Sequence, residues 1–173
     1  MSEKHNYYQE KYETMPLDEL RALQSERLVK QVRYVYENVA YYRRKMDEKG
    51  VAPDDIRGIE DLHKLPFLSK EDLREAYPYG LLARPLKDCV RIQSTSGTTG
   101  RRVVTFYTQH DLDLWEDCCA RAIVAAGGSK EDVVQVCYGY GLFTGGAGLH
   151  GGSHKVGSLT LPMSSGNTER QIQ

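Results

Sequence analysis

The sequence lacks the features that mark several specialised classes of protein. Its four cysteines include no C-x-x-C pair, so their spacing suits neither a zinc site nor a disulfide framework. It has no apolar run of about 18 residues, as a membrane-spanning helix requires, and its polar N-terminus is unlike a secretory signal. The formal net charge of −1 gives no indication of binding to nucleic acid or to an acidic membrane. We therefore expect reduced thiols and a cytoplasmic protein.

What remains is the composition of an ordinary globular chain. The 173 residues are 40% hydrophobic and 27% charged, which is typical of proteins with a packed core. This length suffices for one domain, or for a small domain followed by part of a larger one.

The first half of the chain has the periodicity of helices. Apolar residues recur every three or four positions over 17–37, and a second short helix is expected over Tyr41–Lys49, ending at Gly50. Ser69 and Asp72 have the spacing of a capping box, which predicts a third helix that continues to Ala76. We expect an N-terminal helical subdomain over residues 1–85.

The second half has the pattern of an α/β fold. A capping box at Thr108–Asp111 predicts a helix that stops at Gly127 and Gly128, and a helix begins near Glu169. Strands are expected over residues 90–93, 103–107, 132–136 (buried) and 156–161. The series halts with an unfinished sheet. We therefore interpret residues 86–173 as the incomplete start of an α/β domain, and the chain as a fragment.

The loop between the first two strands carries the clearest chemical signal. Its small, hydroxyl-bearing residues allow backbone amides to converge on an anion, and the arginine that follows adds positive charge. It is not a Walker A loop, because no Gly-Lys-Ser/Thr ends it. A hairpin turn with solvated hydroxyls is the alternative. The candidate phosphate-binding residues are Thr95, Ser96, Gly97, Thr98, Thr99, Gly100 and Arg101.

This loop resembles the signature loop of adenylate-forming enzymes, which embraces the β- and γ-phosphates of ATP. Over roughly residues 10–173 the chain is similar to phenylacetate–CoA ligases, most clearly in 41–45, 61–74, 138–146 and 162–171. The resemblance implies an N-terminal helical subdomain followed by the first part of the large adenylate-forming domain. It also places an aryl-acid pocket at Tyr138, Tyr140, Phe143 and Gly145, where aromatic walls suit a flat apolar ring.

The sequence departs from the family pattern at two places. Arg102-Val103 stands where the superfamily usually has Pro-Lys, and Arg101 stands where many phenylacetate–CoA ligases have lysine. The run from His150 to His154 replaces the usual His-Tyr-Gly-Ala-Glu. The identity of the carboxylic acid therefore stays open. The candidates are phenylacetate, another aryl acetate, a benzoate and a short acyl acid.

The implied activity is that of an ATP-dependent, AMP-forming acid–CoA ligase. Its co-substrates are ATP with Mg²⁺, an aryl or acyl carboxylate and CoA, with neither nucleic acid nor membrane as partner; monomer and homodimer both stay open. The chain carries no candidate catalytic or metal-binding residue, because the family's acidic motif and catalytic lysine lie downstream. By itself it is expected to be inactive.

Two other functional hypotheses and one metal hypothesis compete with this interpretation. The chain could be a non-catalytic module that binds a nucleotide or a partner through a vestigial loop. Gly146-x-Gly148-x-x-Gly151 fits a dinucleotide-binding motif, although no strand directly precedes it. His150 and His154 have the spacing of metal ligands on a helix, but no third ligand is near in sequence, which favours surface histidines.

Overall fold

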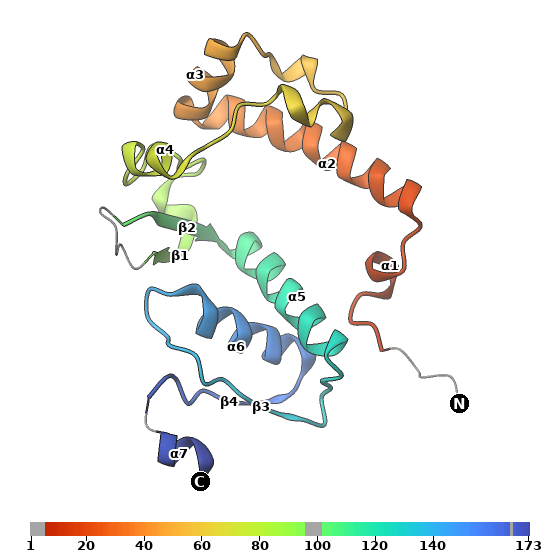
Figure 1. The fold of residues 1–173 in the computed structure, drawn as a ribbon, viewed down its shortest axis with the longest axis vertical. Helices are drawn as coiled ribbons and strands as arrows, with labels where there is room; N and C mark the ends of the chain where they lie inside the picture. Colours follow the sequence, from red (N-terminus) through yellow and green to blue (C-terminus); the bar gives the residue numbers. More distant parts are fainter. Residues whose placement is uncertain (1–5, 96–101, 167) are drawn as a thin grey trace. The chain divides into compact units, whose positions relative to one another are not determined.

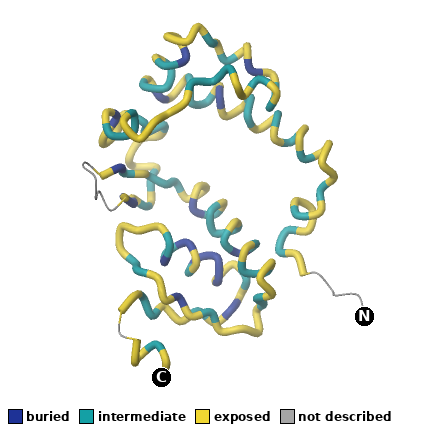
Figure 2. The backbone as a smooth tube through the Cα atoms, in the orientation of Figure 1, coloured by how far each residue is buried: buried dark blue, intermediate teal, exposed yellow. Residues whose placement is uncertain are grey.

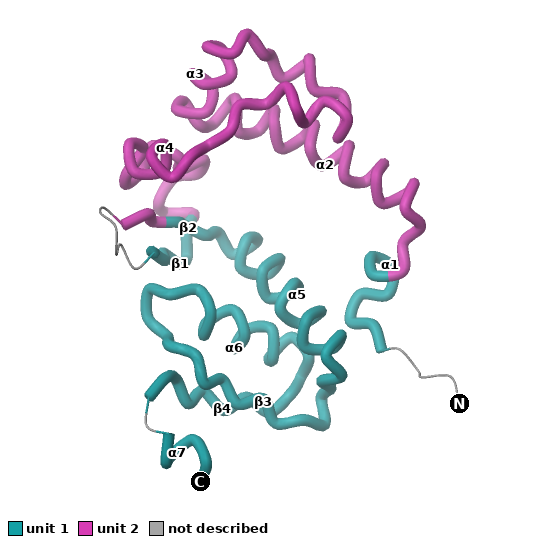
Figure 3. The backbone as a smooth tube through the Cα atoms, in the orientation of Figure 1, with its two compact units in different colours: residues 1–13, 89–96, 105–173 teal, residues 14–88, 97–104 magenta. Residues whose placement is uncertain are grey.

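The computed structural model describes residues 6–95, 102–166 and 168–173, which group into two compact units (Figures 1 and 3). Unit 1 takes its described residues from the ranges 1–13, 89–96 and 105–173. Unit 2 takes them from 14–88 and 97–104. Each unit has its own packing and is described by itself.

Unit 2 is helical. Its two long helices are α2 (Leu17–Asn38) and α3 (Ala40–Lys49), and α3 ends at Gly50 in the left-handed conformation with φ 69°. Short helices follow in the order η1 (Pro53–Asp55), η2 (Ile59–Lys64), α4 (Lys70–Glu75) and η3 (Leu86–Asp88). The helices predicted over 17–37, 41–49 and from residue 69 are thus confirmed, to within a residue or two at their ends.

The core of unit 2 is small and apolar. Val32 from α2, Met46 from α3 and Ile56 after η1 are buried together. The side chains packed around them are Leu28, Tyr36, Tyr42, Val51 and Leu65. Burial of these apolar surfaces fixes the two long helices against each other and against the segment that follows them.

A polar cluster holds α4 against α3. Ser69 accepts a hydrogen bond from the amide of Asp72, as the capping box predicted. The Asp72 carboxylate in turn accepts from the Tyr41 hydroxyl at 2.9 Å and pairs with Lys45. These bonds, led by that with Lys45, hold the pKa of Asp72 well below its usual range. Burial, together with Asp72 and Glu75, raises the pKa of Tyr41 to about 12.

Unit 1 contains two small sheets and two main helices. In chain order its elements are α1 (Glu10–Glu13), β1 (Cys89–Ser94), β2 (Val104–Thr108), α5 (Gln109–Ala125), β3 (Val133–Gln135), α6 (Thr144–Val156), β4 (Leu159–Leu161) and α7 (Thr168–Ile172). Strand β1 pairs with β2, and β3 pairs with β4 in parallel, with Val133 opposite Leu159. Helix α6 is therefore the crossover of a β3–α6–β4 unit.

The second capping box is confirmed at the start of α5. Thr108 accepts a hydrogen bond from the amide of Asp111, and the Asp111 carboxylate accepts from the amide of Thr108 at 2.8 Å. The predicted stop is also confirmed, because α5 ends at Ala125, before Gly127 and Gly128. Local sequence signals thus determined both ends of this helix.

The prediction of a buried strand over 132–136 is only half right. Strand β3 forms there, but its residue Val133 is 63% exposed, and Leu159 opposite it on β4 is 69% exposed. Among the described residues β3 has one strand neighbour, β4, so its side chains lack the two covered faces that a central parallel strand has.

Close packing of α6 on α5 forms the centre of unit 1, where buried residues gather on both helices (Figure 2). Added Cβ atoms at Gly148, Gly151 and Gly152 would lie within 2.7 Å of atoms in α5. Those atoms belong to Trp115, Glu116 and Cys119. Glycine thus lets the two helix backbones approach more closely than any larger residue would allow.

Side chains also bind the N-terminal segment to this helix pair. Asp117 on α5 accepts hydrogen bonds from the Tyr8 hydroxyl at 3.3 Å and from Gln9 Nε2 at 3.1 Å. Lys155 on α6 forms an ion pair with Asp117 at 3.4 Å. One carboxylate therefore joins three segments of unit 1.

Exchange of Gly152 for alanine tests the helix contact. A Cβ atom there would lie 2.4 Å from Cβ of Cys119 and 2.9 Å from the backbone nitrogen of Ala120. We expect Gly152→Ala to lower the free energy of unfolding by about 1–3 kcal/mol through overpacking, even though alanine favours a helix by ~1 kcal/mol over glycine. Urea unfolding followed by the fluorescence of Trp115, the single tryptophan, measures this change.

Gly151→Ala is the matched control. The nearest atoms that its Cβ would meet belong to the Glu116 side chain, which can rotate away, so the loss should be smaller than for Gly152→Ala. Wild-type stability in Gly152→Ala would contradict the close contact between the helices.

Candidate functional site

Strand β1 leads directly to the predicted phosphate loop. Thr95, the first loop residue, follows β1 and is exposed. The other predicted ATP-binding residues, Ser96 to Arg101, lie outside the described residues. The structure therefore places the entrance of the loop at the end of β1.

The predicted acid-binding residues lie between β3 and the first turn of α6. Tyr138 is 62% exposed and Phe143, the N-cap of α6, is 49% exposed. The Tyr138 ring packs over Gly145, where an added Cβ would lie 2.6 Å from the ring. Glycine at this position thus allows an aromatic ring to rest on the helix backbone.

Two hydrogen bonds bring these two regions together. The amide of Ser94, at the end of β1, donates to the carbonyl of Leu142 at 2.9 Å. The side chain of Gln93 donates through Nε2 to the carbonyl of Phe143 at 3.0 Å, across 50 positions of sequence. The residues just before the phosphate loop therefore contact the segment that carries the acid-binding residues.

Tyr140 takes part in a small cluster with two histidines. Its hydroxyl lies 3.1 Å from Nδ1 of His150, and the ring centroids of His150 and His154 are 4.4 Å apart. Burial lowers the pKa of His150, His154 lowers it further, and Glu116 on α5 acts in the opposite direction. A neutral His150 that carries its proton on Nε2 can accept a hydrogen bond from the Tyr140 hydroxyl at Nδ1, which holds the tyrosine side chain in place.

Among the described residues, no third metal ligand of the usual kind joins the histidine pair. In the described part of the chain, no group of three or more His, Cys, Asp or Glu residues could hold a metal ion. A protein site for zinc needs three or four such ligands.

The glycines of the Gly146-x-Gly148-x-x-Gly151 motif have a structural role in helix packing in this chain. All three glycines lie inside α6 rather than in a turn between a strand and a helix. Gly146 lies against the carbonyl of Gly139, and the other two lie against α5. Close packing thus explains this motif without a bound dinucleotide.

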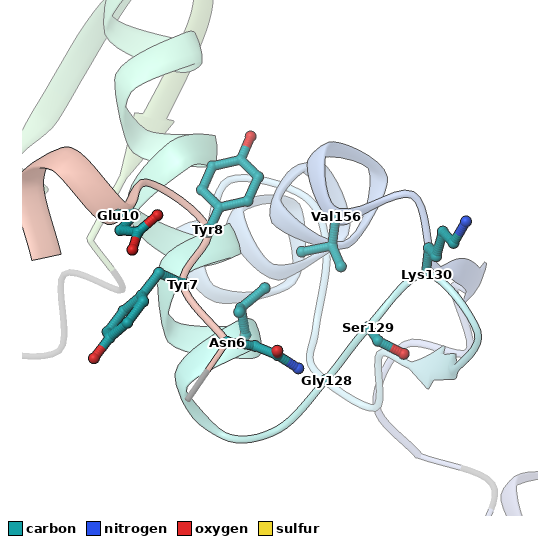
Figure 4. Close-up of a pocket in the computed structure, with 9 residues that line it drawn as sticks. Asn6, Tyr7, Tyr8, Glu10, Gly128, Ser129, Lys130 and Val156 are labelled. Carbon is teal, nitrogen blue, oxygen red and sulfur yellow. The ribbon is translucent and has the colours of Figure 1, made fainter. Parts of the chain in front are cut away.

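A pocket of about 420 Å³ lies elsewhere in unit 1 (Figure 4). It lies between the N-terminal segment and the loop after α5, and both polar and apolar side chains line it. The residues around it are Asn6, Tyr7, Tyr8, Glu10, Val124, Gly128, Ser129, Lys130 and Val156. None of the predicted site residues that the structure describes lines this pocket.

Curated proteins with similar sequences indicate the family that the chain resembles. The chain is 51% identical over 161 residues to phenylacetate–coenzyme A ligase of Escherichia coli, and 50% identical over 165 residues to the enzyme of that name from Thermus thermophilus. These matches cover 93% and 95% of the chain. Over most of its length, the chain is thus similar to the N-terminal part of phenylacetate–CoA ligases.

Solved structures agree with this family at the level of the fold. Two crystal structures of 2-hydroxyisobutyryl-CoA ligase, one with 2-HIB-AMP and one with 2-HIB-AMP and CoA, match at TM-scores of 0.82 and 0.85. Their sequences are 26% and 29% identical to the chain, and the matches cover 89% and 91% of it. The predicted α/β fold of an adenylate-forming enzyme is therefore confirmed. No protein-family profile matches the chain.

The similarity extends over only part of each relative. The chain spans 37% of both curated phenylacetate–CoA ligases, at their N-terminal end, and about a third of each CoA ligase structure. In the described part of the chain, no helix combines the length and the apolar character that crossing a bilayer requires.

The lowered pKa of His150 predicts how stability changes with pH. Between that pKa and about 6.5, the ordinary value, the unfolded chain binds more protons at this residue than the folded chain does. Stability is therefore lost as pH falls below about 6.5, and this residue has no effect above it. We expect His150→Asn to show a smaller fall in Tm between pH 7 and pH 5 than the wild type.

The matched control is His110→Asn, at an exposed histidine on α5. Because His150 is intact in this variant, its Tm should fall more between pH 7 and pH 5 than that of His150→Asn. NMR titration of the His150 ring checks the cause directly, and a midpoint at or above 6.5 would contradict it.

Proposed function

We propose that this chain supplies the ATP-phosphate loop and part of the acid pocket of an AMP-forming acid–CoA ligase that activates an aryl, phenylacetate-like carboxylate. The observation that carries the proposal is the pair of hydrogen bonds from Gln93 and Ser94 to Phe143 and Leu142. They bring the entrance of the predicted loop against the predicted acid-binding segment. A shared site for ATP and acid requires this proximity.

The reaction has two steps. The carboxylate attacks the α-phosphorus of ATP to give acyl-AMP and pyrophosphate, and the CoA thiol then displaces AMP. The first step depends on positioning and charge stabilisation more than on an acid or a base. In this proposal residues Thr95 to Gly100 hold the leaving pyrophosphate through amides and hydroxyls, and Arg101 adds a positive charge.

Magnesium belongs to the proposal as a partner of ATP. It neutralises phosphate charge, and it is usually held by the substrate phosphates with one or two carboxylates rather than by a protein cage. The chain's own contribution to the polyphosphate is the hydroxyl-rich loop.

The acid would bind beside Phe143. Exposed aromatic side chains at positions 138 and 143 offer apolar surface to a ring, and Tyr140 is held by His150. The name of the relatives, phenylacetate–CoA ligase, indicates phenylacetate as the first acid to test. The division into a helical subdomain over 1–85 and the start of an ATP-binding domain over 86–173 is a further part of the proposal, as is a cytoplasmic location. Monomer and homodimer both stay open.

A hybrid enzyme tests the function. In the E. coli phenylacetate–CoA ligase, the matched N-terminal segment is replaced by that of this chain. We expect pyrophosphate release that depends on phenylacetate, followed by formation of the thioester, whereas the 173-residue chain alone should give no turnover. Binding of ATP without turnover in the hybrid would favour the non-catalytic module instead.

Loop variants of the hybrid test the role of the phosphate loop. We expect Thr99→Ala to lower kcat about a hundredfold. Loss of one hydrogen-bond donor that stabilises charge in a transition state lowers kcat by about this factor in other enzymes. Thr105→Ala is the matched control, because Thr105 is an exposed threonine on β2. Equal rates in the two variants would contradict the assignment of the loop.

A further inference from the structure

Gln93 is a buried polar residue with only half of its amide group satisfied. It lies near the end of β1 and is 1% exposed. Its Nε2 donates to the carbonyl of Phe143 at 3.0 Å. Its Oε1 is buried and has no hydrogen-bond partner in the described structure.

This arrangement has a cost for stability. A buried acceptor that lacks a donor loses its bonds to water and gains none in return. Methionine has a similar length and volume and would fill the same space without a polar atom in need of a partner. Stability alone therefore does not explain a glutamine at this position.

What the glutamine side chain provides is one bond to a particular backbone atom. Phe143 is the N-cap of α6 and makes no side-chain capping bond, so its position depends on the backbone around it. Gln93 stands two positions before Thr95, where the predicted phosphate loop begins. Its Nε2 bond thus joins the entrance of that loop to a predicted acid-binding residue.

We propose that Gln93 is a positioning residue that holds Phe143, and the predicted acid-binding segment with it, at a fixed distance from Thr95, where the predicted phosphate loop begins. This inference rests on the proposed function. Adenylation requires the carboxylate and the α-phosphorus to lie in line, and small displacements of either reactant lower the rate. A buried side-chain bond between the two regions provides that alignment before the substrates bind.

The first test uses the 173-residue chain and needs no activity. Gln93→Met removes both the Nε2 donor and the unpaired Oε1. We expect the amides of residues 142–146 to exchange hydrogen roughly fivefold faster, the factor for loss of one ordinary hydrogen bond, while the midpoint of urea unfolding stays equal or rises. Unchanged exchange in this segment overturns the proposal.

Gln135→Met is the matched control. Gln135 is an exposed glutamine on β3 whose Nε2 also donates to a backbone carbonyl, that of Gln171, at 3.0 Å. Its replacement should leave exchange over residues 142–146 at the wild-type rate. Equal acceleration in both variants would mean a general loosening of unit 1 and would also overturn the proposal.

The second test measures kinetics in the hybrid enzyme. We expect Gln93→Met to raise KM for phenylacetate roughly fivefold, with KM for CoA unchanged. A variant that is less stable but has the wild-type KM for the acid would show a merely structural role and overturn the proposal. If the hybrid that retains Gln93 gives no turnover, that result counts against the proposed function. The hydrogen-exchange experiment then tests by itself whether Gln93 holds Phe143 in position.

Discussion

The contact between α5 and α6 determines where the candidate site lies. Glycines on one face of α6 allow its backbone to rest on Trp115, Glu116 and Cys119. Gly146, in the first turn of the same helix, rests on the carbonyl of Gly139. The helix is thereby pressed against α5 and also against the segment that precedes it. This segment carries the predicted acid-binding residues. Helix packing therefore determines the path of its backbone.

The site is assembled mainly by backbone contacts. The Tyr138 ring lies on the backbone of Gly145, and the carbonyls of Leu142 and Phe143 accept bonds from β1. A backbone framework of this kind leaves the side chains of Tyr138 and Phe143 exposed, as the proposed acid pocket requires. A change of acid could therefore be accommodated by different side chains on the same framework, as the departures from the family pattern at 150–154 suggest.

Local signals in the sequence predicted much of the fold. The capping boxes at Ser69 and Thr108 and the stops at Gly50 and Gly127 were visible because each acts over a few residues. The strand over 132–136 was correctly located but wrongly expected to be buried, because burial depends on strand neighbours that a local pattern does not specify.

Helix α6 was not predicted, and the reason is physical. Five of its 13 residues are glycine, which disfavours a helix by about 1 kcal/mol each relative to alanine. Packing against α5 compensates for this cost, and tertiary contacts of that kind leave little trace in a single sequence. The spacing of the glycines at 148, 151 and 152, on one helical face, was the signal that could have indicated it.

The residues of the candidate site were predicted from resemblance. The hydrogen bond that connects them to Gln93 on β1 was not predicted. Tyr138, Tyr140, Phe143 and Gly145 were identified through a family pattern, and the structure places them within one short segment. No sequence pattern marked Gln93, because its role depends on a hydrogen bond to Phe143, a residue 50 positions away. Contacts across such a distance require the fold to be known.

The glycine motif at 146–151 shows how one spacing can arise from two different constraints. In a dinucleotide-binding turn, glycines let the backbone approach a pyrophosphate. In α6, the same residues let one backbone approach another helix and a neighbouring carbonyl. Both constraints exclude a Cβ atom, so the glycines alone cannot distinguish them. What distinguishes them is the preceding structure: Gly146 is already inside the helix that begins at Thr144, and the residues before it form the segment bonded to β1. The motif therefore belongs to the packing that positions the site, while the candidate phosphate contact remains with the loop that follows Ser94.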